Sequence, residues 1–455
     1  MNIGDKFTVN IEKMSNSGTG ITHVNGIVVF VYGACTGDKL EITISKISKS
    51  FAEADISNIL EPSIYRSSPF CPMQKVCGSC QLQHIDYDYQ LEIKRETVQD
   101  ALHSIAGIDI EVPLTIPSPD NHVYRHKIQY PVSQTKVSKR ILAGYYKPQS
   151  HDIVNIKYCP IQPKICDEII EFIRENIPSY KLSGYNEELH KGDLKHVVLR
   201  VSAFNKKVLV TLVLNAKNIS SDLEKFAKKL YDNFEDVVGV CVNLNPKKTN
   251  VILADKTLCL VGQDFVEEKL LDKVFTIGAD TFFQVNPKSA ENIFSYVKKE
   301  IEKSNNPSIL DAYAGIATFG IVVSDAAKEV TSVEANNNSI KMAKEAAKIN
   351  GVSNVELFAD DTAKYLKKIK RKFDITILDP PRKGCTKESL YEAIKHTKDK
   401  IIYVSCNPAT LARDLKYLLE NGYEILSVQP FDMFCHTYHV ETVVVLKNKL
   451  SSAAI

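Results

Sequence analysis

Two short apolar segments near the carboxyl end constrain the fold of this chain most strongly. The first, residues 374–378, ends at Asp379 and is followed by two prolines, as a buried parallel strand does where it breaks into a rigid loop. The second, residues 401–404, leads through a serine into Cys406, and helix-like sequence separates the two segments. Parallel strands joined by a helix end at the same edge of a sheet, where open α/β folds place their chemistry. We therefore expect Asp379 and Cys406 to face one pocket.

Three strand-like segments upstream of this pair also end in acidic residues. Asp311 opens a glycine-containing turn, DAYAGIATFG, which is typical of the first strand-to-helix turn of a nucleotide-binding fold. Glu334 lies at the tip of the next strand, where a carboxylate would hold ribose hydroxyls. Asp360 and Asp361 end the third strand, where an acid can accept the amino proton of adenine. Together these acids predict an α/β, Rossmann-like domain over residues 266–455.

The turn after Asp311 distinguishes between cofactors. A dinucleotide-binding loop requires GxGxxG, whereas GIATFG has Ala317 at the second glycine position, so S-adenosylmethionine fits the sequence better. We expect the methyl group of Ala317 to be tolerated if its backbone avoids positive φ. Enzymes that methylate amino groups place tyrosine after the prolines of the fourth strand, and here that residue is Arg382.

Cys406 supplies a nucleophile, which methylation of a nitrogen does not need. A thiolate that adds to carbon 6 of a uracil makes carbon 5 reactive enough to attack a sulfonium methyl group. The proton on carbon 5 must then leave, and this step needs a general base on the same face of the ring. Glu441, in HVETVVVL at the start of the predicted last strand, is the residue we assign to that role.

A group of cysteines lies far upstream. Cys71, Cys77 and Cys80 occur in CPMQKVCGSC, and Cys159 in YCPIQP can complete a four-thiolate site for a [4Fe-4S] cluster or a tetrahedral zinc ion. Zinc more often uses two CxxC motifs and only one is present, so the spacing leans toward a structural cluster. The spacing is not the one that serves radical S-adenosylmethionine chemistry. Eleven cysteines in a long chain without an export signal also argue against a disulfide framework.

The amino-terminal part is rich in short β segments. Residues 1–60 alternate such segments with glycine turns, which predicts a small closed or nearly closed β-barrel. Residues at about 87–106 have the apolar spacing of a helix, and basic residues interleaved with tyrosines at 124–148 suit phosphates and unpaired bases. These features indicate a central α+β domain at 61–265, whose helix is available to pack on the catalytic domain.

Composition sets few further limits. The 57 basic and 55 acidic residues nearly cancel, so any nucleic-acid surface must be a local patch. No apolar run approaches the roughly 18 residues of a membrane span, and the amino terminus lacks the basic and hydrophobic stretches of an export signal. We expect a cytoplasmic protein with no membrane partner.

Over nearly its whole length the chain resembles the class I RNA uridine-5 methyltransferases of the TrmA/RumA type. The matching motifs are GTG, IVVFV and the GD turn of an OB-like TRAM domain, the cysteines of CPMQKVCGSC, FFQVN, DAYAGIATFG, DPPRKG, SCNPATLARDL and HVET. The resemblance implies RNA as the partner, a [4Fe-4S] cluster on Cys71, Cys77, Cys80 and Cys159, Cys406 as nucleophile and Glu441 as base. It also implies a site for S-adenosylmethionine formed by Gln284, Tyr313, Glu334 and Asp361 or Asp360, with Asp379 beside the methyl donor or the uracil edge.

The same resemblance favours one class of RNA as the substrate. The TRAM domain and the cysteines indicate a 23S rRNA enzyme, because the tRNA-specific bacterial members of the class lack both, and we expect a monomer. The alternatives are a tRNA uridine-5 methyltransferase, an RNA cytosine-5 methyltransferase and a non-catalytic RNA-binding factor that retains the pocket. The cytosine enzymes often carry a cysteine directly after the proline of strand four, where this chain has Arg382.

Overall fold

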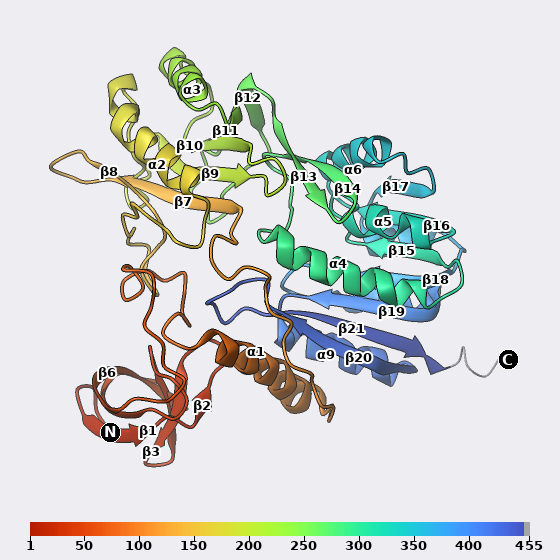
Figure 1. Ribbon diagram of the computed structural model, residues 1–455, viewed down its shortest axis with the longest axis horizontal. Helices are drawn as coiled ribbons and strands as arrows, with labels where there is room; N and C mark the ends of the chain where they lie inside the picture. Colours follow the sequence, from red (N-terminus) through yellow and green to blue (C-terminus); the bar gives the residue numbers. More distant parts are fainter. Residues whose placement is uncertain (450–455) are drawn as a thin grey trace.

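The amino-terminal strands form one curved sheet around its own apolar core. The computed structural model describes residues 1–449 (Figure 1). The strands are β1 (Lys6–Asn10), β2 (Lys13–Met14), β3 (Gly20–Val24), β4 (Ile27–Val31), β5 (Lys39–Ile47) and β6 (Phe51–Glu61). Along β5, Leu40, Ile42 and Ile44 enter the core while their neighbours are partly exposed, as the two-residue period of a strand dictates. The hydrogen-bonded order β1-β5-β6-β4-β3-β2 is linear and β1 lies close to β3, so the sheet is nearly closed without a described ladder joining its ends.

A long helix connects this barrel to the rest of the molecule. Helix α1 (Tyr87–Ala101) begins after Asp86, whose side chain accepts hydrogen bonds from the first turn, and continues as a π-helical turn, η1 (Leu102–Ala106). The helix predicted at about 87–106 is therefore present. Ile93 packs among barrel residues, whereas Val98 packs in the core of the carboxyl-terminal domain.

The middle of the chain forms a six-stranded mixed sheet with its helices on one face. Its order is β12-β11-β10-β9-β7-β8, and β10 and β11 are the parallel pair that α3 connects. The elements are β7 (Lys127–Gln134), β8 (Ile141–Ala143), α2 (Lys164–Asn176), η2 (Ile177–Tyr180), β9 (Leu194–Val201), β10 (Val208–Leu214), α3 (Ser221–Asn233), β11 (Val237–Leu244) and β12 (Thr257–Gly262). Apolar residues of α2 and α3 pack on alternate residues of β9, β10 and β11.

The carboxyl-terminal part contains a seven-stranded sheet in the order β17-β16-β15-β18-β19-β21-β20, in which only β21 runs against its neighbours. Strand β15 is buried along its whole length, as parallel strands covered on both faces are. This is the predicted Rossmann-like domain. Its elements are β13 (Phe265–Leu270), β14 (Lys273–Gly278), α4 (Pro287–Glu302), β15 (Ser308–Ala312), α5 (Thr318–Val322), η3 (Ser324–Ala326), β16 (Glu329–Glu334), α6 (Asn337–Ile349), β17 (Val355–Ala359), α7 (Thr362–Lys368), β18 (Phe373–Leu378), α8 (Lys387–His396), β19 (Thr397–Ser405), α9 (Pro408–Glu420), β20 (Tyr423–Phe431) and β21 (Glu441–Asn448).

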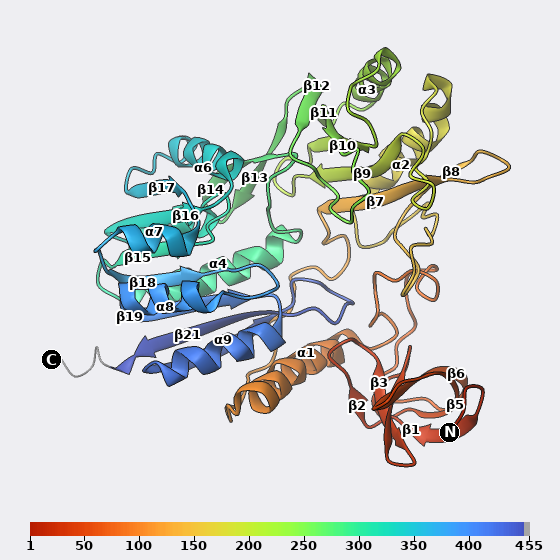
Figure 2. The same ribbon diagram turned by 180° about the vertical axis from the view of Figure 1, so that it is seen from behind.

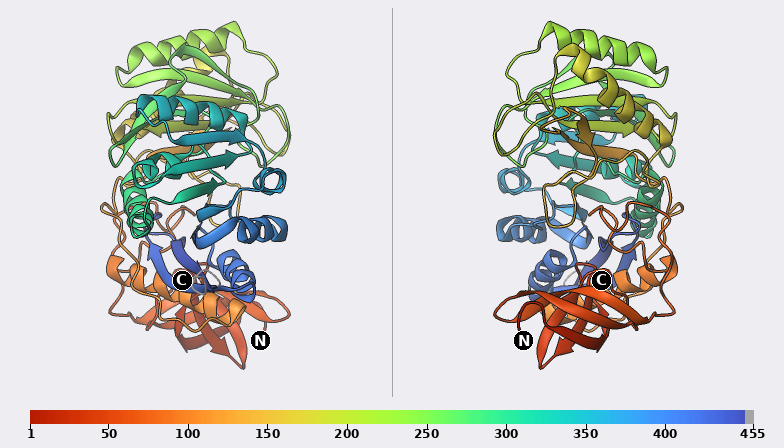
Figure 3. Two further views of the ribbon diagram at one scale, coloured as in Figure 1. Left: turned by 90° about the vertical axis from the view of Figure 1, so that its right-hand side faces the viewer. Right: turned by 90° about the vertical axis from the view of Figure 1, so that its left-hand side faces the viewer.

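The three parts are stacked along the molecule. Figure 3 shows the seven-stranded sheet between the central sheet above and the barrel below. Helix α1 lies between the barrel and α9, as both Figure 1 and the view from behind in Figure 2 show. None of the helices in residues 1–449 combines the length and the apolar composition of a membrane span.

Candidate active site

The expected pair of strand ends meets at one edge of the seven-stranded sheet. Strands β18 and β19 are parallel, with Leu378 beside Tyr403, so both chains leave the sheet on the same side. Asp379 follows β18 directly, and Cys406 follows β19 directly. Both side chains are partly exposed, and Cys406 lines the cavity described below, whereas Asp379 is not among the residues that line it.

Glu441 enters the same edge from the opposite direction. It is the first residue of β21, which runs antiparallel to β19 and pairs Thr442 with Ser405. Cys406 and Glu441 are the residues next to this pair, and the negative charge of Glu441 acts on the thiol of Cys406. Glu441 is only 5% exposed, so its carboxyl group is largely shielded from water.

The charges at this edge act on one another. Burial, with repulsion from Glu441 and Asp379, raises the pKa of Cys406 to about 11 against the opposing charge of Arg382. Burial and repulsion from Asp379 raise the pKa of Glu441 to about 8, and Arg382 again opposes the shift. Burial and repulsion from Asp311 raise the pKa of Asp379 to about 7. At neutral pH the thiol and the carboxyl of Glu441 therefore both tend to hold a proton.

A cavity of about 410 Å³ opens in front of Cys406. It lies where the sheet edge, α1 and the barrel meet, so three separate parts of the chain form its walls. The catalytic domain contributes Arg382, Asn407 and His439, helix α1 and η1 contribute Thr97 and Ser104, and the barrel contributes Lys13, Asn16 and Phe30. A planar heterocycle with its attached phosphates fits a hollow of this size and composition.

The two loops at the edge are tied to each other. Asn407 caps α9 by accepting a hydrogen bond from the backbone of Ala409, and its amide donates to the carbonyl of Arg382 at 3.2 Å. The hydroxyl of Thr410 donates to the same carbonyl at 3.2 Å. Cys406 is thus held between a strand end and a capped helix.

The glycine turn after β15 has an unusual backbone. Tyr313, Gly315 and Ala317 have φ of 61°, 55° and 56°, all in the left-handed region. The expectation that Ala317 would be tolerated by avoiding positive φ is therefore wrong. Its methyl group is instead accepted in a fully buried, left-handed conformation that costs roughly 1 kcal/mol. Glu334 holds this turn, because its carboxylate accepts hydrogen bonds from the backbone nitrogens of Gly315 at 3.0 Å and Asn336 at 2.8 Å.

Asp311 lies buried beneath the same turn. One carboxylate oxygen, Oδ2, accepts hydrogen bonds from the nitrogen of Gly320 and the hydroxyl of Ser332, both at 3.0 Å. The other, Oδ1, has no hydrogen-bond partner among residues 1–449. Burial raises the pKa of Asp311 to about 7, and the negative charge of Glu334 adds to the shift.

The remaining predicted cofactor residues lie around this turn or to one side of it. Asp360 donates its backbone N–H to the carbonyl of Glu334, and Asp361 caps α7 with its carboxylate exposed. Gln284 lies farther toward the central domain, in a small hollow that Lys127 and Arg200 also line. The strand tips thus bring the acids together, whereas Gln284 lies where the central and carboxyl-terminal domains meet.

The four cysteines of the upstream motif surround one hollow of about 20 Å³. Burial raises the pKa of Cys80 well above its usual range, and the charges of Cys159, Cys77 and Cys71 raise it further, which requires the four sulfurs to be close. Arg125 is their nearby positive charge, and its Nε is sealed from solvent with no hydrogen-bond partner in the described chain. Within residues 1–449, no three His, Cys, Asp or Glu side chains converge on a single metal-ion position.

Three residues near the edge were missed by sequence reasoning. His439 lines the cavity with Cys406, and Lys94 and Asp432 form a fully buried ion pair behind it. Lys94 could have been identified from the sequence, because it lies on the apolar, buried face of α1. A cation at such a position requires a buried partner of opposite charge. Nothing in the sequence around Asp432 identifies it as that partner.

Comparisons with known proteins agree with this architecture. Residues 86–449 match the family model described as tRNA (uracil-5-)-methyltransferase, and residues 2–57 match the TRAM domain. A protein of Clostridium tetani described as an uncharacterized RNA methyltransferase is 37% identical over 443 residues, which are 97% of this chain and 96% of that protein. A protein of Synechocystis with a similar description is 37% identical over 447 residues, or 98% and 96% of the two chains.

One solved structure is similar over almost the whole chain. It is the crystal structure of the Pyrococcus abyssi tRNA (uracil-54, C5)-methyltransferase in complex with S-adenosyl-L-homocysteine. The similarity has a TM-score of 0.76 and 29% sequence identity, and it covers 96% of this chain and 99% of the other.

Proposed function

The chain belongs to the tRNA (uracil-5-)-methyltransferase family of RNA-methylating enzymes and carries a TRAM domain, and from this premise we propose how its site works and on which RNA. The reaction is transfer of a methyl group from S-adenosylmethionine to carbon 5 of a specific uridine in RNA. The proposed route is a covalent bond between Cys406 and the uracil. The observation that supports it is that Cys406 lines a cavity of about 410 Å³ and that the charge of Glu441 acts on its thiol.

Cys406 and Glu441 divide the reaction between them. The thiolate of Cys406 adds to carbon 6, which moves the electrons of the 5,6 double bond to carbon 5 and its neighbouring carbonyl. Carbon 5 then takes a methyl group and becomes tetrahedral. In its ionised form, which a pKa of about 8 leaves partly populated near neutral pH, Glu441 removes the proton left on carbon 5, the double bond re-forms, and the bond between carbon 6 and sulfur breaks. Arg382 assists the first step, because its positive charge opposes the rise in the pKa of Cys406.

The turn after β15 supports a site for S-adenosylmethionine. A side chain added at Gly315 would meet no atom within 4 Å, so the turn leaves open space above it, and the free Oδ1 of Asp311 lies beneath. When bound, S-adenosylmethionine supplies an electrophilic methyl group. The residues that we propose to hold it are Gln284, Tyr313, Glu334, Asp361 and Asp379.

We assign a [4Fe-4S] cluster to Cys71, Cys77, Cys80 and Cys159. Zinc more often uses two CxxC motifs, and this chain has one. The four cysteines surround a common hollow next to the unpartnered Nε of Arg125. An anionic cluster held by four thiolates suits a site beside a buried cation. Its role in this proposal is structural.

The proposed substrate is 23S rRNA, acted on by a single chain. The support is the TRAM domain together with the cysteine site. A second candidate is tRNA, which the name of the Pyrococcus abyssi enzyme favours, since that enzyme is similar over 96% of this chain.

The direct test is methylation of purified RNA. The protein would be incubated with methyl-labelled S-adenosylmethionine and unmodified 23S rRNA or total tRNA, and the digested nucleosides would be separated. We expect labelled 5-methyluridine from 23S rRNA, and none with Cys406→Ala. Label found only in tRNA would show that tRNA, and not 23S rRNA, is the substrate. Label in 5-methylcytidine would show that the target is cytidine and not uridine. No label from either RNA would overturn the proposal.

A further inference from the structure

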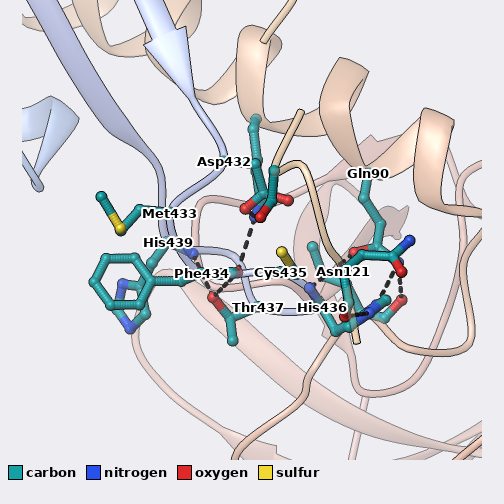
Figure 4. A network of polar contacts seen from close by, with 12 residues as sticks. Gln90, Asn121, Asp432, Met433, Phe434, Cys435, His436, Thr437 and His439 are labelled. Atoms are coloured by element: carbon teal, nitrogen blue, oxygen red, sulfur yellow. Dashed lines mark hydrogen bonds and ion pairs between the residues drawn. The ribbon is translucent and has the colours of Figure 1, made fainter. Parts of the chain in front are cut away.

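The segment between β20 and β21, residues 432–440, leads directly into Glu441 and carries His439. It has no helix or strand, yet Asp432, Met433 and Cys435 are completely buried. A segment without its own ladder keeps its shape only through contacts with its surroundings. Figure 4 shows these contacts, several of which come from α1.

The first contact from α1 is an ion pair. The Nζ of Lys94 lies 2.5 Å from Oδ1 of Asp432, and both side chains are fully buried. The same ammonium group donates to the carbonyl of Phe434 at 3.0 Å, and the hydroxyl of Tyr87 donates to Oδ2 of Asp432 at 2.8 Å. Two turns of α1 therefore hold the start of the segment by charge and by hydrogen bonds.

The second contact is made by Gln90, one turn before Lys94. Its Oε1 accepts a hydrogen bond from the backbone nitrogen of His436 at 3.1 Å, and its Nε2 lies 3.3 Å from Nδ1 of the same residue. Nε2 also donates to the carbonyls of Leu82 at 3.1 Å and Ile85 at 2.8 Å. The backbone nitrogen of Leu82 in turn donates to the carbonyl of His436 at 2.9 Å. Gln90 thus joins α1, the segment after the cysteines and the 432–440 segment.

The backbone at the centre of this network is strained. His436 has a φ of 63°, a left-handed conformation that a residue with a side chain keeps only where its surroundings fix it. The contacts from Gln90 and Leu82 are made to the backbone of His436. Nε2 of His436 also lies 2.9 Å from the carbonyl of Asn121. Loss of the Gln90 amide would therefore remove the restraint on the backbone nitrogen of His436 and loosen the chain that follows it.

Cys406 does not depend on these contacts. It lies between β19 and the capped start of α9, where Asn407 binds the carbonyl of Arg382. The nucleophile is held by the sheet and α9, whereas the segment that leads into Glu441 is held largely by α1. The start of α4 also contributes, because Asn286 and Ser289 donate hydrogen bonds to backbone carbonyls of this segment.

We propose that Lys94 and Gln90 are positioning residues that hold the 432–440 segment. By holding this segment they orient His439 and Glu441 toward the uracil bound to Cys406. This inference rests on the proposed function. It predicts a step-specific defect: when the segment is released, the thiol still attacks, but removal of the carbon 5 proton slows. The covalent complex with ordinary RNA should then accumulate.

The main test compares two substitutions on one helix. Gln90→Met keeps the length and helix propensity of the side chain but removes its amide. The matched control is Gln99→Met, because the hydrogen bonds of the Gln99 side chain within residues 1–449 are to Arg95 and the backbone nitrogen of Val112, and none is to the 432–440 segment. The measurements are kcat, KM and the fraction of enzyme bound covalently to unmodified uridine RNA at steady state.

For Gln90→Met we expect kcat to fall by roughly ten- to a hundredfold, the size of effect that misplacement of a catalytic group produces, with KM changed by less than about twofold. The covalently bound fraction should rise several-fold above that of the unchanged protein. Gln99→Met should behave like the unchanged protein. A purely structural role would instead lower kcat and the bound fraction together, in proportion to the folded protein, and that result would overturn the inference.

Two further measurements keep the test decisive. Lys94→Met combined with Asp432→Asn removes both charges of the buried pair, so no lone charge is left inside, and it should give the same accumulation of covalent complex.

In the unchanged protein, the amides of residues 432–440 should exchange with deuterium as slowly as those of α1. Fast exchange would overturn the inference even if no variant folds. If the unchanged protein forms no complex with 5-fluorouridine RNA, the proposed function fails, whereas a complex without accumulation in Gln90→Met refutes only the positioning role.

Discussion

Cys406 directly follows Ser405 and Glu441 directly precedes Thr442, the pair that joins β19 to β21, and the negative charge of Glu441 raises the pKa of the Cys406 thiol. The backbone ladder brings both residues to one edge of the sheet, and the segment before Glu441 orients its side chain. Either side chain can therefore be replaced while the other keeps its place, and the two roles can be tested separately.

The charges around Cys406 predict opposite effects of two substitutions. Glu441→Gln removes a negative charge that raises the pKa of Cys406, so the thiol should ionise at lower pH, whereas Arg382→Gln removes a positive charge that lowers that pKa. The check is the rate of alkylation of the 406 thiol by iodoacetamide, followed by mass spectrometry between about pH 7 and pH 10. Shifts of the same sign in both variants would contradict this arrangement of charges.

The buried carboxyl of Asp311 predicts that replacing it stabilises the folded protein more at high pH than at low pH. Burial moves its pKa from 3.8 to about 7, so the folded protein keeps a proton that the unfolded chain loses, and the free energy of unfolding falls as pH rises through this interval. Asp311→Asn removes that penalty. Relative to the unchanged protein, the variant should gain roughly 2–3 kcal/mol more at about pH 8 than at about pH 5 in denaturant unfolding. An equal difference at both pH values would show that the carboxyl is not protonated in the fold.

The left-handed backbone of Ala317 predicts that glycine does not destabilise the protein at this position, although it does at a helical alanine. Ala317→Gly should leave the free energy of unfolding unchanged or raise it by up to about 1 kcal/mol, because relief of strain offsets the greater freedom of the unfolded chain. Ala343 in α6 is the control, since it is equally buried but helical, and Ala343→Gly should cost about 1 kcal/mol or more. Equal losses in both variants would contradict the strain at Ala317.

The cysteine hollow predicts which thiols retain iron. Cys159→Ser should lower the iron and acid-labile sulfide of protein purified without oxygen, because Cys159 lines the hollow. Cys166→Ser is the matched control, since Cys166 is buried in the same core but does not line the hollow. Zinc in place of iron in the unchanged protein, or iron lost equally from both variants, would refute the cluster assignment.

The sequence was informative where chemistry follows from local pattern. Apolar segments ending in Asp379 and Cys406 predicted two parallel strands with a common edge, and the structure has both. Periodicity likewise predicted α1. Three features depend on contacts between distant residues and were not predictable. The positive φ of Ala317 is set by the turn around it, and the linear order of the barrel strands is set by how they pair. Lys94 meets Asp432 across 338 positions of sequence.

The central claim is that the sulfur of Cys406 bonds to carbon 6 of a uracil, and a covalent trap tests it most directly. Fluorine at carbon 5 cannot leave as a proton does, so the enzyme should remain attached to 5-fluorouridine RNA once the methyl group has been transferred. The measurement is the mass of the complex formed with S-adenosylmethionine, followed by peptide mapping. We expect one RNA-linked peptide containing Cys406 and no complex with Cys406→Ala. A complex that persists in Cys406→Ala, or attachment at another cysteine, would contradict the account.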